Sequence, residues 1–210
     1  MTPTVVFDLD KVLLNGNTTA LLLGAHLRRQ PAGLLRLLAA APLLLPGFVI
    51  PPLRPLAELL STRLTVGRDS AVLDGYRNAV ARTPEAAVAE ALGCLRSHAS
   101  RGDRVVVATA SEESLARGFL AALGYADADV VGSNVRLWPP RVRRTRGKAK
   151  VAQLIERGFP PPWTAVYSDS ADDLPLFAGT PRPVLVNPTE RALRAVARGL
   201  GRRPEIATWR

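Results

Sequence analysis

Two carboxylates near the start of the chain, Asp8 and Asp10, lie one residue apart at the end of an apolar run. Two unpaired charges are costly in a buried strand, so the spacing of these carboxylates indicates a catalytic function. One carboxylate can attack phosphorus and form an aspartyl-phosphate, while the other protonates the leaving alcohol and later deprotonates water. Because two close carboxylates repel each other, we expect a cation beside them, and oxygen ligands suit Mg²⁺. The pair therefore predicts phosphoryl transfer, with Asp8 as the nucleophile and Asp10 as the acid and base.

A second acidic group occurs in the segment YSDSADDLPLF, which contains Asp169, Asp172 and Asp173. One of these carboxylates can complete a metal site with Asp8. The alternative is that they only enrich a helix N-terminus in acidic residues, with Ser170 or Asp172 as its cap. The DLD segment in the same chain favours the metal site.

A phosphate oxygen could be bound by the segment ATASEES. Thr109 brings a hydroxyl to the end of an expected strand, and backbone amides, including that of Ala110, follow at a helix N-terminus. Ser111 can cap the same helix, and both roles are compatible.

Two lysines, Lys148 and Lys150, lie at the start of another predicted helix. The helix dipole disfavours cations at this end, so their placement indicates a function. Pairing with phosphate or with Asp8 is the function we expect.

Short apolar segments of the kind typical of buried parallel strands precede most of these polar groups. We expect strands at residues 5–9, 104–108, 164–167 and 183–186, a short one at 129–131, and helices at 111–123, 148–157 and 190–199. Alternating strands and helices predict an α/β fold with a Rossmann-like, doubly wound parallel sheet. Ligands bind beyond the carboxyl ends of such strands, so Asp8, Thr109 and Asp169 should meet at one edge of the sheet.

A long insert without strand signals follows the first strand. The sequence predicts a catalytic core of residues 1–15 and 100–210 and a helical cap of residues 16–99. Residues 37–53 carry no charge, but they fall short of a membrane-spanning length and are interrupted by prolines. Residues 34–60 can therefore be two short helices in the core of the cap, or an apolar surface, flanked by arginines, that sits in a bilayer interface or receives a lipid tail.

Composition restricts the other classes of function. A 47% share of hydrophobic residues and 22% of charged residues indicate a folded chain rather than a disordered one. The single cysteine, Cys94, excludes an intramolecular disulfide and is expected in the core, and two histidines are too few for a His-rich metal site. The net charge of +10 agrees with a phosphorylated or anionic partner, whereas a nucleic-acid site would need the interleaved aromatics that the basic segments lack. We expect no nucleic acid and no obligate protein partner.

The ordered segments DLDKV, Thr109, GKAKVAQL and DSADD resemble the four motifs of the haloacid dehalogenase superfamily, in the helical-cap subclass that includes phosphoserine phosphatase. The resemblance implies that Thr109, Ala110 and Lys150 bind phosphate. It also implies that Asp8, Asp169 and the backbone carbonyl of Asp10 bind Mg²⁺. Asp173 and Asp172 are expected to support the site. Lys11, Val12 and Ser168 depart from the usual motifs without removing a catalytic group.

The substrate is predicted from two further features. Phosphoserine phosphatases carry a glutamate where this chain has Asn17, which argues against phosphoserine. The Arg-flanked apolar segment after it is similar to the cap of the bacterial phosphatidylglycerophosphate phosphatases of the superfamily. We therefore expect a Mg²⁺-dependent phosphatase that acts on a lipid phosphate such as phosphatidylglycerophosphate.

The location expected for such an enzyme is the cytoplasm, peripherally at the inner face of the membrane, because the chain enters a strand at once and shows no signal peptide. An anionic membrane surface is then an expected partner. The alternatives are a phosphatase of a soluble metabolite and an inactive membrane-binding module with the same fold.

Overall fold

A computed structural model describes residues 2–18, 21, 31–50, 53, 57, 60, 86–137 and 140–209 of the chain. The strands are β1 (Thr4–Phe7), β2 (Arg104–Glu112), β3 (Asp129–Leu137), β4 (Pro140–Arg143), β5 (Ala165–Ser168), β6 (Pro183–Val186) and β7 (Glu205–Ala207). The helices are α2 (Pro31–Val49), α5 (Ala89–Ser100), α6 (Glu113–Ala122), α7 (Lys148–Glu156), the 3₁₀ turn η3 (Ala171–Asp173), α8 (Leu174–Phe177) and α9 (Glu190–Leu200).

The strands form one sheet in the order β4-β3-β2-β1-β5-β6-β7. Every pairing from β3 to β7 is parallel, and β4 alone runs antiparallel to its neighbour β3. The predicted Rossmann-like parallel sheet is thereby confirmed. The sequence missed β4 and β7, and it placed the end of β3 too early.

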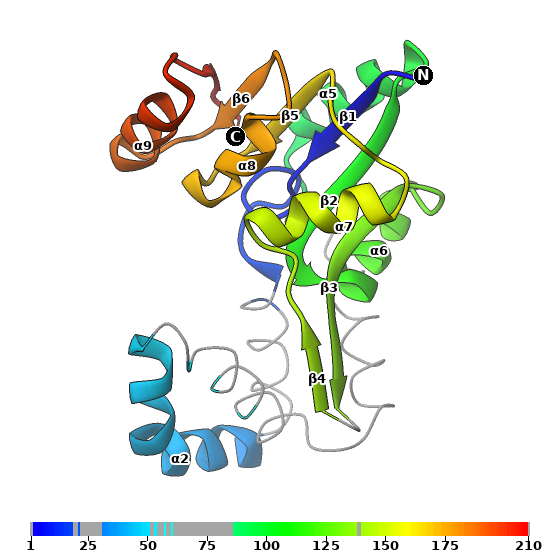
Figure 1. Cartoon of the computed structure of the whole chain (residues 1–210). Helices are drawn as coiled ribbons and strands as arrows, with labels where there is room; N and C mark the ends of the chain where they lie inside the picture. Colours follow the sequence, from blue (N-terminus) through cyan, green and yellow to red (C-terminus); the bar gives the residue numbers. More distant parts are fainter. Residues whose placement is uncertain are drawn as a thin grey trace.

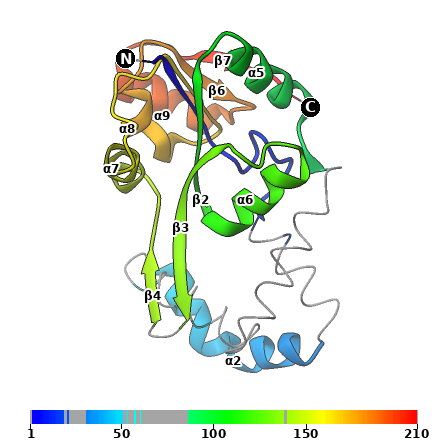
Figure 2. The same ribbon diagram turned by 90° about the vertical axis from the view of Figure 1, so that its right-hand side faces the viewer.

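Helices cover both faces of this sheet (Figures 1 and 2). One face packs on α5 and α6 through Leu95, Phe119 and Leu120, while the other packs on α7, α8 and α9. The strands between them are apolar on both sides, so that Val5 and Val6 contribute to opposite core clusters. This double covering explains why the strand segments read as continuous apolar runs.

The helix α5 belongs to the layer that covers the sheet. Ala91 and Leu95 are buried in the same cluster as β1 residues. The predicted domain boundary assigned this helix to the cap, whereas its buried side chains pack on the catalytic core. In the rest of the proposed cap the structure describes mainly residues 31–50, whereas residues 22–30 and 61–85 lie outside the described residues.

The apolar helix α2 continues through Pro42 and Pro46 and ends at Val49. The prolines were expected to interrupt this stretch, but the helix runs through both positions, and the amide of Ile50 still donates to the carbonyl of Pro46 at 2.9 Å. In both views α2 lies away from the covered sheet, at the end of the molecule toward which the β3–β4 hairpin extends (Figures 1 and 2). Across the described residues we find no helix with the length and apolarity needed to cross a bilayer.

Candidate active site

The register of the three central strands brings the predicted polar residues to one edge of the sheet. Phe7 of β1 pairs with Val107 of β2 on one side and with Tyr167 of β5 on the other. The residues that follow these three positions therefore lie side by side at one edge of the three-strand centre of the sheet. They include Asp8, Thr109 and Asp169, which we expected to meet on the basis of the strand pattern alone.

Asp8 remains tied to the sheet although β1 ends one residue earlier. Its amide donates to the carbonyl of Tyr167 at 2.8 Å, and its Oδ1 accepts from the amide of Leu9 at 2.9 Å. The residue is 9% exposed, so its side chain is almost completely enclosed. Such burial raises the pKa of Asp8 to about 7, with Lys150 opposing the shift and Asp173 and Asp10 adding to it.

Lys150 lies between two carboxylates in the interior. Its Nζ is 3.1 Å from Oδ1 of Asp8 and 2.8 Å from Oδ2 of Asp173. Burial alone would lower the pKa of this lysine, but the two facing carboxylates outweigh that effect and raise it above its usual range. Lys150 is therefore a fixed cation beside the candidate nucleophile.

A glycine with an unusual backbone conformation precedes the helix that carries Lys150. Gly147 precedes α7 with φ 56°, a left-handed conformation that favours glycine. Lys148 then lies exposed in the first turn of α7, whereas Lys150 is buried. The exposed lysine and the buried one thus occupy different environments within one turn.

Asp173 and Asp172 are neighbours in the sequence, but their carboxylates have different partners. Asp173 Oδ2 accepts from Lys150 and, at 2.7 Å, from the hydroxyl of Ser168. Asp172 is exposed and forms an ion pair with Arg146. Asp173 thus holds the site lysine in place, whereas Asp172 pairs with Arg146 at the surface.

Asp10 is oriented by two hydroxyl residues that the sequence did not assign to it. Its Oδ1 accepts from the amide of Thr18 at 2.7 Å and from the Thr18 hydroxyl, and its Oδ2 accepts from the Ser111 hydroxyl at 2.6 Å. Thr18 is fully buried and Ser111 nearly so. Both carboxylate oxygens are therefore held in place.

The end of β2 is irregular, which explains the unexpected position of Ser111. The pairing with β3 shifts register between Ala108 and Glu112, and the strand continues to Glu112. Such irregularities redirect side chains next to functional sites. The helix α6 begins only at Glu113, and the side chain of Glu112, not that of Ser111, caps it by accepting from the Leu115 amide.

Thr109 and Ala110 lie in this irregular segment, at the edge beside Asp8. The Thr109 hydroxyl oxygen is buried and accepts from the amide of Ser111 at 3.0 Å. Ala110 is exposed, and its carbonyl accepts from the Ser133 hydroxyl at 2.6 Å. Their predicted binding of phosphate is compatible with this position and stays a prediction.

Asp169 lies at the same edge, partly enclosed. Burial raises its pKa, while Lys11, whose Nζ is 3.6 Å from Oδ2, acts in the opposite direction. Lys11 itself has a left-handed φ of 60°, in the turn that carries the chain out of β1. The turn is closed by a bond from the Lys11 amide to the carbonyl of Gly16 at 3.0 Å.

The oxygen atoms that could bind Mg²⁺ at this site come partly from side chains and partly from the backbone. Within the described ranges, no three His, Cys, Asp or Glu side chains are grouped closely enough to hold a metal by themselves. Asp8 and Asp169 would supply two carboxylates, and the carbonyl of Asp10 a third oxygen. Mg²⁺ commonly binds through one or two carboxylates and keeps several waters or phosphate oxygens, so this set fits it better than a metal that needs a full protein cage.

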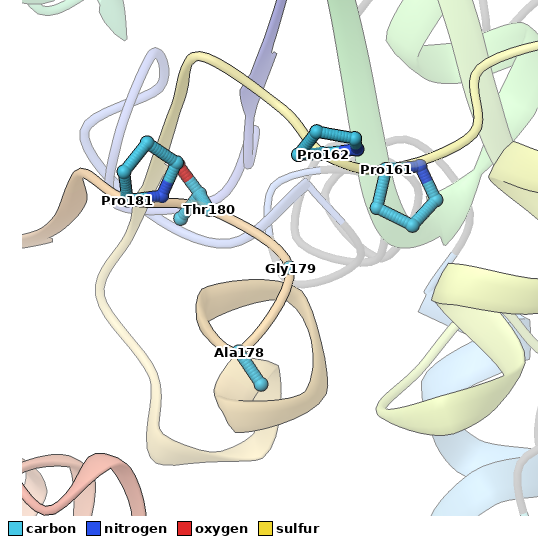
Figure 3. A pocket seen from close by; sticks show the side chains of 6 residues that line it. All are labelled: Pro161, Pro162, Ala178, Gly179, Thr180 and Pro181. Atoms are coloured by element: carbon cyan, nitrogen blue, oxygen red, sulfur yellow. The ribbon is translucent and has the colours of Figure 1, made fainter.

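A surface hollow elsewhere on the molecule has different chemistry (Figure 3). It is lined by loop residues that precede β5 and β6, namely Pro161, Pro162, Ala178, Gly179, Thr180 and Pro181. These loops lie at the amino ends of the strands, the opposite edge from Asp8. The hollow carries no charged group and is not the candidate active site.

Comparison with known proteins agrees with this architecture. A search of curated protein sequences finds no match. Among solved structures, the chain is similar to a protein of unknown function from Bordetella pertussis Tohama I, with 20% identity, a TM-score of 0.74 and 98% of each chain covered. It is also similar to a phosphoserine phosphohydrolase-like protein from Francisella tularensis subsp. tularensis SCHU S4, with 12% identity, a TM-score of 0.62 and coverage of 98% of this chain and 94% of that one.

A further similar structure is a phosphoserine phosphatase in its apo form, with 12% identity, a TM-score of 0.61 and coverage of 93% and 91%. At these identities the likeness shows a shared fold. The sequence itself matches the family model for haloacid dehalogenase-like hydrolases over residues 5–178, from β1 through α8. Because this match spans most of the chain and includes every residue of the candidate site, the protein is an enzyme that belongs to the haloacid dehalogenase-like hydrolases.

Proposed function

We propose that the protein is a Mg²⁺-dependent phosphomonoesterase that works through an aspartyl-phosphate and acts on a lipid phosphate such as phosphatidylglycerophosphate. The observation that carries the reaction is the pair of differently held carboxylates. Asp8 is enclosed beside Lys150, and Asp10 is bound by Ser111 and Thr18. Two carboxylates in different environments suit two different roles.

The first step requires a carboxylate oxygen of Asp8 to attack phosphorus. The new P–O bond forms as the bond to the alcohol oxygen breaks, and Asp10 in its acid form gives that oxygen a proton. Lys150 remains charged beside Asp8 and offsets the negative charge of the phosphoryl group. The free alcohol leaves, and the phosphoryl group stays on Asp8.

In the second step Asp10 acts as a base instead of an acid. A water molecule attacks phosphorus, Asp10 takes its proton, and the bond between phosphorus and Asp8 breaks to release inorganic phosphate. The Ser111 hydroxyl can donate to Asp10 when it is ionised and can rotate to accept from it when it is protonated. The same residue can therefore hold Asp10 in both states.

The metal would be held by Asp8, Asp169 and the carbonyl of Asp10. When bound, Mg²⁺ supplies positive charge beside the transferring phosphoryl group. The raised pKa values of both carboxylates agree with this role, because they reflect burial that a bound cation would offset.

The surface of α2 supports a lipid substrate. Its exposed apolar side chains include Leu43, 85% exposed, and Val49, 78% exposed, together with Leu35, Leu38 and Leu45. Arg36 on the same helix is also exposed, and the whole chain carries a net charge of +10. Apolar surface next to positive charge favours an anionic bilayer, where a phosphomonoester headgroup would be presented. The proposed location is peripheral, on an anionic membrane surface at the cytoplasmic face.

The experiment that tests the substrate compares phosphatidylglycerophosphate in mixed micelles with a panel of soluble phosphomonoesters, with and without Mg²⁺. We expect release of phosphate from the lipid, and loss of that release in Asp8→Asn with an unchanged circular dichroism spectrum. Preference for a soluble ester would contradict the lipid assignment and favour the soluble-metabolite phosphatase. Full activity in Asp8→Asn would contradict the nucleophile.

A second measurement tests, without relying on turnover, whether the apolar surface of α2 binds membranes. Sedimentation with vesicles containing anionic lipid should recover the wild type, and Leu43→Ser should reduce that fraction. Ile155→Ser is a matched control, since Ile155 is also exposed, at 48%, but lies on α7. Equal sedimentation of all three proteins would contradict the role of α2.

A further inference from the structure

A chain of hydrogen bonds connects the irregular end of β2 to the helix that carries Lys150. The hydroxyl of Ser133 on β3 donates to the carbonyl of Ala110 at 2.6 Å and accepts from the amide of Thr145 at 2.9 Å. The hydroxyl of Thr145 donates to Oε1 of Gln153 on α7 at 2.9 Å. Gln153 Nε2 in turn donates to the carbonyl of Arg144 at 2.9 Å.

The three side chains that form this hydrogen-bond network are buried. Thr145 is fully enclosed, and Ser133 and Gln153 are each 5% exposed. Each of their polar groups has a partner, so the arrangement avoids the cost of about 1–3 kcal/mol for an unsatisfied buried group. A fully satisfied buried network also fixes the positions of its members more narrowly than apolar packing does.

Both ends of the network lie next to residues of the candidate active site along the chain. Ala110 lies between Thr109, the expected phosphate ligand, and Ser111, which binds Asp10. Gln153 lies three residues after Lys150, so the two side chains share one side of α7. Lys150 contacts Asp8 directly. The apolar part of β2, at Ala108, packs in the same core cluster as Leu154 of α7. The segment at Ala110 is linked to α7 by hydrogen bonds through Ser133 and Thr145.

We propose that Ser133, Thr145 and Gln153 are positioning residues that set the phosphate-binding segment at Ala110 against the helix of Lys150. This inference rests on the proposed phosphatase function. Without the network, Lys150 stays bound to Asp8 and Asp173, and β2 stays packed on α7 through its apolar side chains. The irregular segment at Ala110, however, loses the hydrogen bonds that fix its position relative to α7. Small displacements of binding groups reduce turnover strongly, so the network acts on affinity and rate together.

The test compares two substitutions at one position. Thr145→Val keeps the shape of the side chain and removes only the hydroxyl, whereas Thr145→Ser keeps the hydroxyl. We expect Thr145→Val to lower kcat/KM about tenfold and to weaken the binding of inorganic phosphate, measured by titration calorimetry in Mg²⁺ buffer, by a similar factor. Thr145→Ser should stay within about twofold of the wild type in both measurements.

Thr180→Val is the matched control for lost stability. Thr180 is also a buried threonine, 6% exposed, whose Oγ1 accepts a hydrogen bond, from the amide of Arg182, but it lies in the hollow of Figure 3 away from the site. We expect it to lower the melting temperature without changing kcat/KM or phosphate affinity. If Thr145→Val does not fold, Ser133→Ala cuts the network at its other end, and the same two measurements apply.

Two results would overturn the inference. One is a Thr145→Val protein that loses stability like Thr180→Val but keeps wild-type phosphate affinity and kcat/KM. The other is an equal loss in Thr145→Val and Thr145→Ser, which would assign the effect to packing. A wild type that hydrolyses no ester would contradict the proposed function, while the comparison of phosphate affinities would still test the network.

Discussion

Asp173 Oδ2 lies 2.8 Å from Nζ of Lys150, and both side chains are almost completely buried. Lys150 therefore carries two carboxylate neighbours in the interior, and Asp173 is the one that is not expected to react. Its function is to hold a charged lysine beside Asp8 at a depth where an unpaired ammonium would be costly.

Asp173→Asn is expected to destabilise the protein by about 3 kcal/mol, because removal of one partner leaves a buried charge only partly compensated. Urea unfolding measures this loss, and phosphatase activity should fall with it. Asp172→Asn is the neighbouring control, since its exposed ion pair with Arg146 should contribute less than about 1 kcal/mol. Equal effects of the two substitutions would contradict the assignment.

Ser111→Ala is expected to lower kcat about tenfold to a hundredfold, since a hydrogen bond to a charged group contributes about 1.5–3 kcal/mol. The cause is the loss of the donor that orients Oδ2 of Asp10. Steady-state kinetics measures it, and Ser114→Ala, whose hydroxyl donates to Glu112 instead, is the control. A kcat for Ser111→Ala within twofold of the wild type would show that Thr18 suffices to hold Asp10.

Lys11→Gln is expected to tighten Mg²⁺ binding about threefold to tenfold. The ammonium of Lys11 lies 3.6 Å from Asp169, so it competes with a divalent cation for the same carboxylate. Titration calorimetry with Mg²⁺ measures the change. Arg36→Gln removes the same charge from the distant helix α2 and should leave the affinity unchanged, and a weaker affinity in Lys11→Gln would mean that Lys11 assists the metal.

Glu113 gives a pH-dependent contribution to stability. Burial alone would raise its pKa, but hydrogen bonds from Arg157, Arg117 and the Gly132 amide outweigh burial and lower it below 4.5. A carboxylate whose pKa is lower in the folded state stabilises the fold at pH values above its unfolded pKa. That contribution is lost as the pH falls through the folded pKa.

Glu113→Gln should therefore be less stable than the wild type near neutral pH, and the difference should shrink as the pH falls below 4.5. Urea midpoints across this range measure it. Glu190→Gln, which removes an exposed i,i+4 partner of Arg194, should show little difference at any pH. A gap between Glu113→Gln and the wild type that widens in acid would reverse the sign of the effect.

The sequence was sufficient to predict the parts of the site that follow from the strands. Asp8, Thr109 and Asp169 meet because parallel strands present their carboxyl ends at one edge, and each strand was recognisable as an apolar run. The missed strands β4 and β7 contain charged residues and are short, so no apolar run marked them.

The partners of Asp10 could not be predicted in the same way. Thr18 is buried and lies eight residues beyond Asp10, after the turn that leaves β1. Ser111 faces Asp10 where β2 shifts register before α6 begins. A serine before a helix is most simply interpreted as its cap, and here Glu112 takes that place. Contacts that depend on an irregular strand leave no periodic signal in the sequence.

The central position of β1 in the sheet affects the order in which the sheet can form during synthesis. This strand is the first to be synthesised, yet its two neighbours are β2 and β5, and β5 ends only at Ser168. A growing chain must carry Asp8 without its second flanking strand until synthesis has passed Ser168. Lys150 and Asp173, the charged neighbours of Asp8 in the folded core, are likewise added long after Asp8 itself.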